Sequence, residues 1–145
     1  MPAVVTGPIS HTLVRALRTV PAFSVLDETT VCDIVGASSN FVWRAGSPIF
    51  EPGDPAEALY IVLSGEIRIV DESEQEVARL GPGDFFGELS LLQRTSHSKR
   101  ADVLEDSELM VLPQQPFEAL LADDPELAEA VRGAMETRLR SVDAY

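Results

Sequence analysis

The chain has 145 residues, of which 45% are hydrophobic, and this composition fits one globular domain. Its net charge of −13 would repel a phosphate backbone, so we expect no binding to nucleic acid. No apolar run approaches the roughly 18 residues of a membrane span. Its single cysteine, Cys32, cannot form an internal disulfide. We therefore expect a cytoplasmic protein that does not insert into membranes.

The first region, residues 9–37, is expected to be helical. Ser10 can cap a short helix that carries Leu17 and stops before Pro21. Asp27 can cap a second helix, whose apolar face is formed by Val31, Ile34 and Val35.

The second region, residues 41–112, is expected to be entirely β. It contains short runs rich in Val, Ile, Leu and aromatic residues: FVWR, PIFE, ALYIVL, EIRIV, EVARL and ELMVL. Turn signals separate these runs, including Ser64-Gly65 between ALYIVL and EIRIV. Runs spaced in this way are typical of a sandwich, barrel or jelly roll. We expect about eight strands between roughly Phe41 and Leu112.

The third region, residues 116–142, returns to helix. Pro116 suits a first helical position. The sequence Asp124-Pro125-Glu126 combines a cap, a first-turn proline and a first-turn acid. Apart from Arg138, the face of this last helix is apolar and consists of Leu127, Val131, Ala134, Met135 and Leu139. Because no segment has the composition of a linker, residues 1–145 are expected to form a single domain.

The glycines and apolar residues of the β region form a recognisable pattern. They are Gly46, Pro48-Ile49-Phe50, Gly53-Asp54, Leu59-Tyr60, Val62, Gly65, Val77, Leu80, Gly83-Asp84-Phe85-Phe86-Gly87-Glu88 and Leu91-Leu92. From about Leu13 to Leu139, the chain resembles the cyclic nucleotide-binding domain family. This family supplies the regulatory module of bacterial cAMP receptor proteins, cyclic-nucleotide-dependent kinases and cyclic-nucleotide-gated channels. The resemblance implies a mainly β fold, a double-stranded β-helix or jelly roll (a β-roll), with N-terminal helices and a C-terminal lid helix pair.

The segment that begins at Gly87 predicts a site for an anion. A glycine that opens a short helical turn lets an anion approach the backbone, where the first N–H groups of the helix are unpaired. By resemblance, this is the family's phosphate-binding cassette, and Glu88 accepts a hydrogen bond from the ribose 2′-hydroxyl. Alternatively, Glu88 is an ordinary carboxylate at a helix start. The residues expected to contact the ligand are Phe86, Gly87, Glu88, Leu89, Ser90, Lys99, Arg100 and Ala101.

The sequence departs from the family at the arginine that pairs with the phosphate. Family cassettes commonly run from Leu-Leu through about four loop residues to this arginine, whereas here residues 93–98 precede Lys99. If Ala101-Asp102-Val103 fixes the register, Lys99 takes the arginine's place. If the loop is longer, Arg100 does, and neighbours on a strand point to opposite faces. We favour Arg100 over Lys99, since a guanidinium offers phosphate a bidentate fork.

The rest of this basic cluster, Arg94 and His97, is expected to lie in a solvated loop. Only one other histidine, His11, occurs in the chain. Two histidines are too few for the metal centre of a jelly-roll enzyme, so we expect no metal, no cofactor and no catalysis.

The resemblance implies a regulatory sensor in signal transduction that binds cAMP or cGMP, with cAMP as the first candidate. Alternatively, the module is degenerate and keeps the fold for a structural or partner-binding role. The helix at 125–142 is expected to act as a lid or as a homodimer contact. Because the chain ends at Tyr145, it has no room for a DNA-binding helix-turn-helix. We therefore expect any effector to be another domain or protein.

Overall fold

The computed structural model describes residues 3–5, 17–18, 23–24, 26–87 and 95–139. Within these residues one sheet contains seven strands: β1 (Ala3–Val5), β2 (Ser39–Trp43), β3 (Pro48–Phe50), β4 (Ala58–Val70), β5 (Glu76–Leu80), β6 (Phe85–Phe86) and β7 (Arg100–Pro113). The longer helices are α2 (Glu28–Ala37), α4 (Gln114–Asp123) and α5 (Pro125–Leu139). The prediction of a mainly β fold with flanking helices is confirmed.

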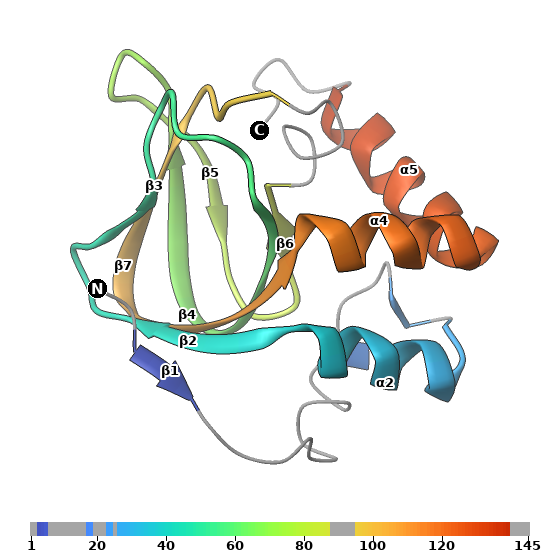
Figure 1. Ribbon diagram of the computed structural model, residues 1–145. Coiled ribbons are helices and arrows are strands. Elements are labelled where there is room, and N and C mark those ends of the chain that lie inside the picture. Colours follow the sequence, from blue (N-terminus) through green and yellow to red (C-terminus); the bar gives the residue numbers. More distant parts are fainter. Residues whose placement is uncertain (1–2, 6–16, 19–22, 25, 88–94, 140–145) are drawn as a thin grey trace.

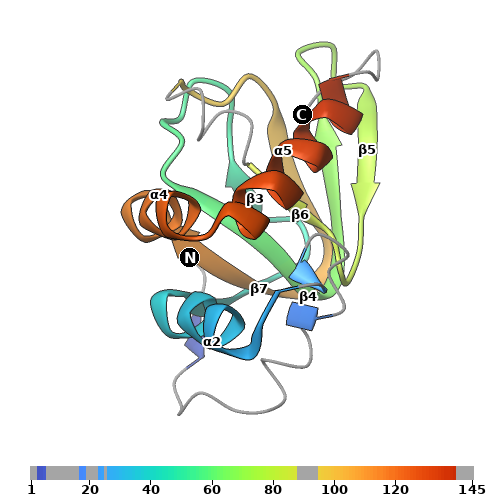
Figure 2. The ribbon, with the colours of Figure 1, turned by 90° about the vertical axis from the view of Figure 1, so that its right-hand side faces the viewer.

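The sheet curls into a roll in which β4 and β7 are the longest strands. The strand order is β1-β2-β7-β4-β5, while β3 pairs with β7 and β6 pairs with β4, and all these pairings are antiparallel. The helices α2, α4 and α5 gather on one side of the roll (Figures 1 and 2). None of the helices in the described ranges is long and apolar enough to cross a membrane.

Two hydrophobic clusters stabilise this arrangement. The helix-facing cluster joins the helices to β4, β6 and β7, and its members include Val31, Leu59, Ile61, Met110, Phe117 and Leu127. The roll-interior cluster lies between the strands and includes Trp43, Phe50, Ile67, Ile69, Phe86, Ala101 and Val103. Burying an apolar side chain of this size stabilises the fold by about 1.5–3 kcal/mol.

Two aspartates cap the helices as their sequence positions predict. The side chain of Asp27 accepts from the backbone N–H of Thr30 at 2.7 Å, and this hydrogen bond lowers the pKa of the carboxyl. Asp124 Oδ1 accepts from the N–H groups of Glu126 and Leu127 at 3.0 and 3.1 Å. The hydroxyl of Thr30 also donates to Asp124 Oδ2 at 2.8 Å, so the two caps are linked.

The other helix boundaries differ in part from expectation. The helix α4 begins at Gln114, so Pro116 is its third residue and not its first. Of the predicted helix after Ser10, only Leu17 and Arg18 lie in the described ranges, and both are helical. In α5 the side chains of Leu127 and Val131 are buried in the helix-facing cluster. The described part of this apolar face is therefore covered within the chain and gives no support for a dimer contact.

The predicted turn at Ser64-Gly65 is wrong, because ALYIVL and EIRIV belong to the single strand β4. The register between β4 and β7 shifts around Ser64 and Glu66, as at a β-bulge. Gly65 has φ +95°, and a Cβ atom there would collide with the side chain of Ser107 on β7. The glycine therefore serves a close approach between two strands, not the end of a strand.

Candidate functional site

Gly87 lies where β6 leaves the sheet. The pairing of Phe86 with Tyr60 on β4 sets its position, and the two aromatic rings stack with centroids 5.2 Å apart. Gly87 has φ +89°, and a Cβ atom there would come within 3.2 Å of both the Ala58 carbonyl oxygen and Tyr60 Cδ2. The conformation and the close packing both favour glycine at this position. Gly87 itself is buried, so the described start of the turn is closely packed glycine backbone.

The three residues after this glycine lie outside the described residues. Glu88, Leu89 and Ser90 are the predicted ribose contact and two of the predicted amide donors, so their roles stay predictions. The geometry of the site is built from the residues on either side of them.

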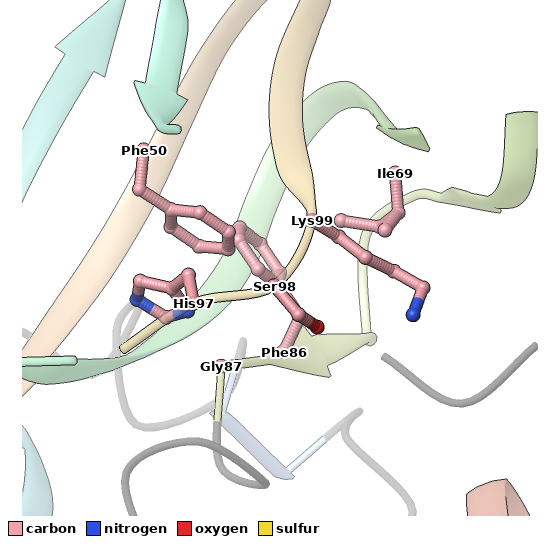
Figure 3. Close-up of a pocket in the computed structure, with 7 residues that line it drawn as sticks. All are labelled: Phe50, Ile69, Phe86, Gly87, His97, Ser98 and Lys99. Atoms are coloured by element: carbon pink, nitrogen blue, oxygen red, sulfur yellow. The ribbon is translucent and has the colours of Figure 1, made fainter. Parts of the chain in front are cut away.

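A small cavity opens next to Gly87, at the mouth of the roll (Figure 3). Its volume is about 20 Å³, which is room for a water-sized group. Pockets that enclose drug-sized ligands are usually about 300–1,000 Å³, so a nucleotide would have to displace neighbouring side chains. The described residues that line the cavity are Phe50, Ile69, Phe86, Gly87, His97, Ser98 and Lys99.

Lys99, and not Arg100, lines this cavity. Its half-buried side chain comes from the residue just before β7 and also borders a shallow depression beside the turn at Asp71–Ser73. The next residue on the same side of the strand, Ala101, is fully buried in the roll interior, although it does not line the cavity. Of the two candidate phosphate residues, the inward one is therefore the lysine.

Arg100 lies on the outer face of the sheet, within an ion-pair network. Its Nη1 and Nη2 donate to the two carboxylate oxygens of Glu74 at 2.8 and 2.6 Å, and its Nε donates to Asp102 at 2.9 Å. Arg68 Nη2 reaches Asp102 at 3.3 Å. These hydrogen bonds raise the pKa of Arg100 and lower that of Glu74. The preference for Arg100 as the phosphate residue finds no support in this arrangement, because its guanidinium is already engaged.

The prediction that His97 is a solvated loop residue is wrong. Its side chain is only 5% exposed, and its ring stacks on Phe50 with centroids 3.6 Å apart and planes 5° apart (Figure 3). Two backbone hydrogen bonds hold it in place, from Gly53 N–H to its carbonyl and from its own N–H to the Asp54 carbonyl. Burial lowers the pKa of the imidazole, while the nearby Asp54 carboxylate partly raises it. Arg94 lies outside the described residues.

The sequence does contain a signal for this position. Counting four loop residues from Leu92 leads to His97, where the family spacing would put its arginine. The two registers expected from the sequence place the phosphate contact at Lys99 or Arg100, two and three residues further along the chain.

Besides Gly87, His97 and Lys99, the cavity is lined by the aromatic rings of Phe50 and Phe86 and by Ile69 and Ser98. Phe50 packs against Tyr60 and Phe86 with ring centroids 5.7 and 6.0 Å apart. Desolvation, followed by the carboxylates of Glu57 and Asp54, raises the pKa of Tyr60 to about 12, so this phenol stays neutral. The cavity is therefore bordered by aromatic rings, by Gly87 and His97, and by Lys99, whose ammonium points away from Gly87 and His97 (Figure 3).

Comparison with known proteins identifies the family of this chain. The family model described as the cyclic nucleotide-binding domain matches residues 41–124. The cyclic AMP receptor protein of Thermus thermophilus is 39% identical over 106 residues, which cover 70% of this chain and 49% of that protein. The chain thus spans about half the length of this relative.

Solved structures extend the match to more than four fifths of the chain. The crystal structure of the Thermus thermophilus catabolite activator protein superposes with a TM-score of 0.75 at 35% identity, covering 83% of this chain and 58% of that one. The N-terminal domain of a transcriptional regulator from Streptomyces coelicolor gives a TM-score of 0.70 at 29% identity, covering 86% of this chain and 92% of that one. The chain belongs to the cyclic nucleotide-binding domain family.

Proposed function

We propose that this domain is a sensor that binds a cyclic nucleotide, with cAMP as the first candidate, and holds its phosphate at the turn that begins with Gly87. The observation that carries this proposal is the cavity that Gly87 and Lys99 line together. In such a site an anion can accept hydrogen bonds from the first amides of the turn and is attracted by a nearby cation.

The family membership supports the same assignment. The matched relative from Thermus thermophilus is named a cyclic AMP receptor protein, which makes cAMP the first ligand to test. By resemblance, Glu88 accepts from the ribose 2′-hydroxyl, and the amides of Leu89 and Ser90 face the phosphate. The wider effects of binding would pass to a partner domain or protein.

Calorimetric titration tests this function directly. The wild type is titrated with cAMP, cGMP and 5′-AMP, the last as a control with an open phosphate. A lost hydrogen bond to a charged group costs about 1.5–3 kcal/mol, so Glu88→Ala should weaken cAMP binding about tenfold or more. Glu28→Ala, which removes an exposed carboxylate on α2, should leave the affinity unchanged.

The small cavity favours a second candidate function. A volume of about 20 Å³ and a lining without arginine among the described residues also suit a module that has lost its ligand and binds a partner protein. If millimolar cAMP and cGMP produce no heat, no thermal shift and no competition, the sensor proposal is wrong and this second reading replaces it.

A further inference from the structure

His97 occupies an unusual environment for a histidine at the mouth of a cavity. The ring stacks on Phe50, and the chain around it is fixed by the two backbone hydrogen bonds to Gly53 and Asp54. A side chain that is 95% buried and held in this way has lost most of its rotamer freedom. The position of this ring beside the cavity is therefore fixed by the fold.

The Nε2 atom of this ring is buried and has no hydrogen-bond partner among the residues that the structure describes. Buried polar side-chain atoms are nearly always paired, since an unmade hydrogen bond leaves the full cost of desolvation. The same side chain lines the cavity together with Gly87, Ser98 and Lys99. The unpaired nitrogen and the cavity together point to a ligand atom as the missing partner.

We infer that His97 is a ligand-contacting residue, whose imidazolium donates from Nε2 to an anionic oxygen of the bound nucleotide, so that binding takes up a proton. This inference rests on the proposed function of the same site. A neutral imidazole has one donor and one acceptor, whereas the protonated ring donates from both nitrogens. An adjacent anion favours the charged ring, and burial without an anion disfavours it. Ligand binding and protonation of His97 therefore stabilise one another.

The charged and titratable groups around the ring determine the sign of the effect. Among the described residues, Asp54 lies on the loop after β3 and attracts the imidazolium. Lys99, the residue just before β7, lines the same cavity and carries a charge of the same sign as the imidazolium. Tyr60 on β4 is neutral, because its pKa is about 12. The free protein thus holds His97 neutral near pH 7, and the anion shifts the ring toward its charged form.

Titrations of cAMP between pH 5.5 and 8.0 test the coupling. The affinity should fall by up to tenfold per pH unit above the pKa of free His97 and level off below it. In two buffers of different ionisation enthalpy, the heats should report uptake of up to one proton per nucleotide. His97→Gln should abolish both the pH dependence and the proton uptake. His97→Arg should bind at pH 8 at least as tightly as the wild type binds at pH 5.5, with no dependence on pH.

Two controls keep the outcome decisive. His11→Gln removes the only other histidine and should leave the pH profile unchanged, and it leaves one imidazole signal in an NMR titration. In that variant the pKa of His97 should rise when cAMP is added, a readout that needs no substitution at residue 97. Binding that is equally tight across the pH range, without proton uptake, would overturn this inference alone. No binding at any pH would overturn the proposed function as well.

Discussion

The two faces of the chain at the start of β7 differ sharply, although their residues alternate in sequence. Lys99 and Ala101 face the roll, where they meet the cavity and the buried aromatic cluster. Arg100 and Asp102 face outward, where they join an ion-pair network with Glu74. The two adjacent cations therefore have different surroundings: Lys99 lines the cavity, while Arg100 links the β4–β5 turn to β7 through Glu74.

The largest expected effect is on stability, when a side chain on the inner face of β4 is truncated and compared with its neighbour on the outer face. Ile67 is fully buried in the roll interior, so Ile67→Ala should lower the free energy of unfolding by about 2–5 kcal/mol. Its neighbour Arg68 points outward to Asp102, and Arg68→Ala should cost at most about 1 kcal/mol. Urea denaturation of the two variants measures both values. Equal losses would mean that the two faces are not distinct in stability.

Substitutions of Lys99 and of Arg100 should differ in their effect on the affinity for cAMP. Lys99→Met keeps the apolar stem but removes the charge, and should weaken cAMP binding about tenfold. Arg100→Met, the matched substitution on the outer face, should change the affinity by no more than about twofold, because its guanidinium already pairs with Glu74. Calorimetric titration gives both affinities. A larger loss for Arg100→Met would show that the guanidinium leaves Glu74 for the phosphate when ligand binds.

The smallest effect concerns the outer ion pair and appears only as a function of pH. Arg100 lowers the pKa of Glu74, so the pair contributes stability above the ordinary glutamate pKa of about 4.3, and this contribution is lost as the pH falls through the lowered value. Glu74→Gln should therefore melt at a lower temperature than the wild type at pH 7. Below about pH 4 the difference between the two should shrink toward zero. A difference that persists at low pH would assign the effect to the turn backbone, where Glu74 has φ +64°.

Local features of the fold could be predicted from the sequence. The caps at Asp27 and Asp124 follow from a carboxylate two or three residues before the N–H groups that it accepts from. The β content and the special place of Gly87 follow from residue types and spacing. Each of these depends on neighbours within a few positions.

The wrong predictions concern residues whose surroundings are set by parts of the chain that are distant in sequence. Whether Gly65 ends a strand or allows a bulge is decided by Ser107 on another strand. The burial of His97 depends on Phe50 and on the backbone around Asp54, which sequence spacing alone does not place beside it. Alternation along β7 implied that only one of Lys99 and Arg100 could face inward, but the choice between them required Glu74 to be located in space.

The long pairing of β4 with β7 has a consequence for how the chain folds. The ladder joins Ala58 to Pro113 at one end and Val70 to Arg100 at the other, so every rung closes a long loop. Loop closure of this kind costs entropy before the contacts repay it, and proteins rich in such non-local contacts fold slowly. The same ladder carries residues of the roll interior toward one end and of the helix-facing cluster toward the other. The cavity and the helix-facing cluster should therefore form together in one late, cooperative step of folding. Transient helices should form before that step.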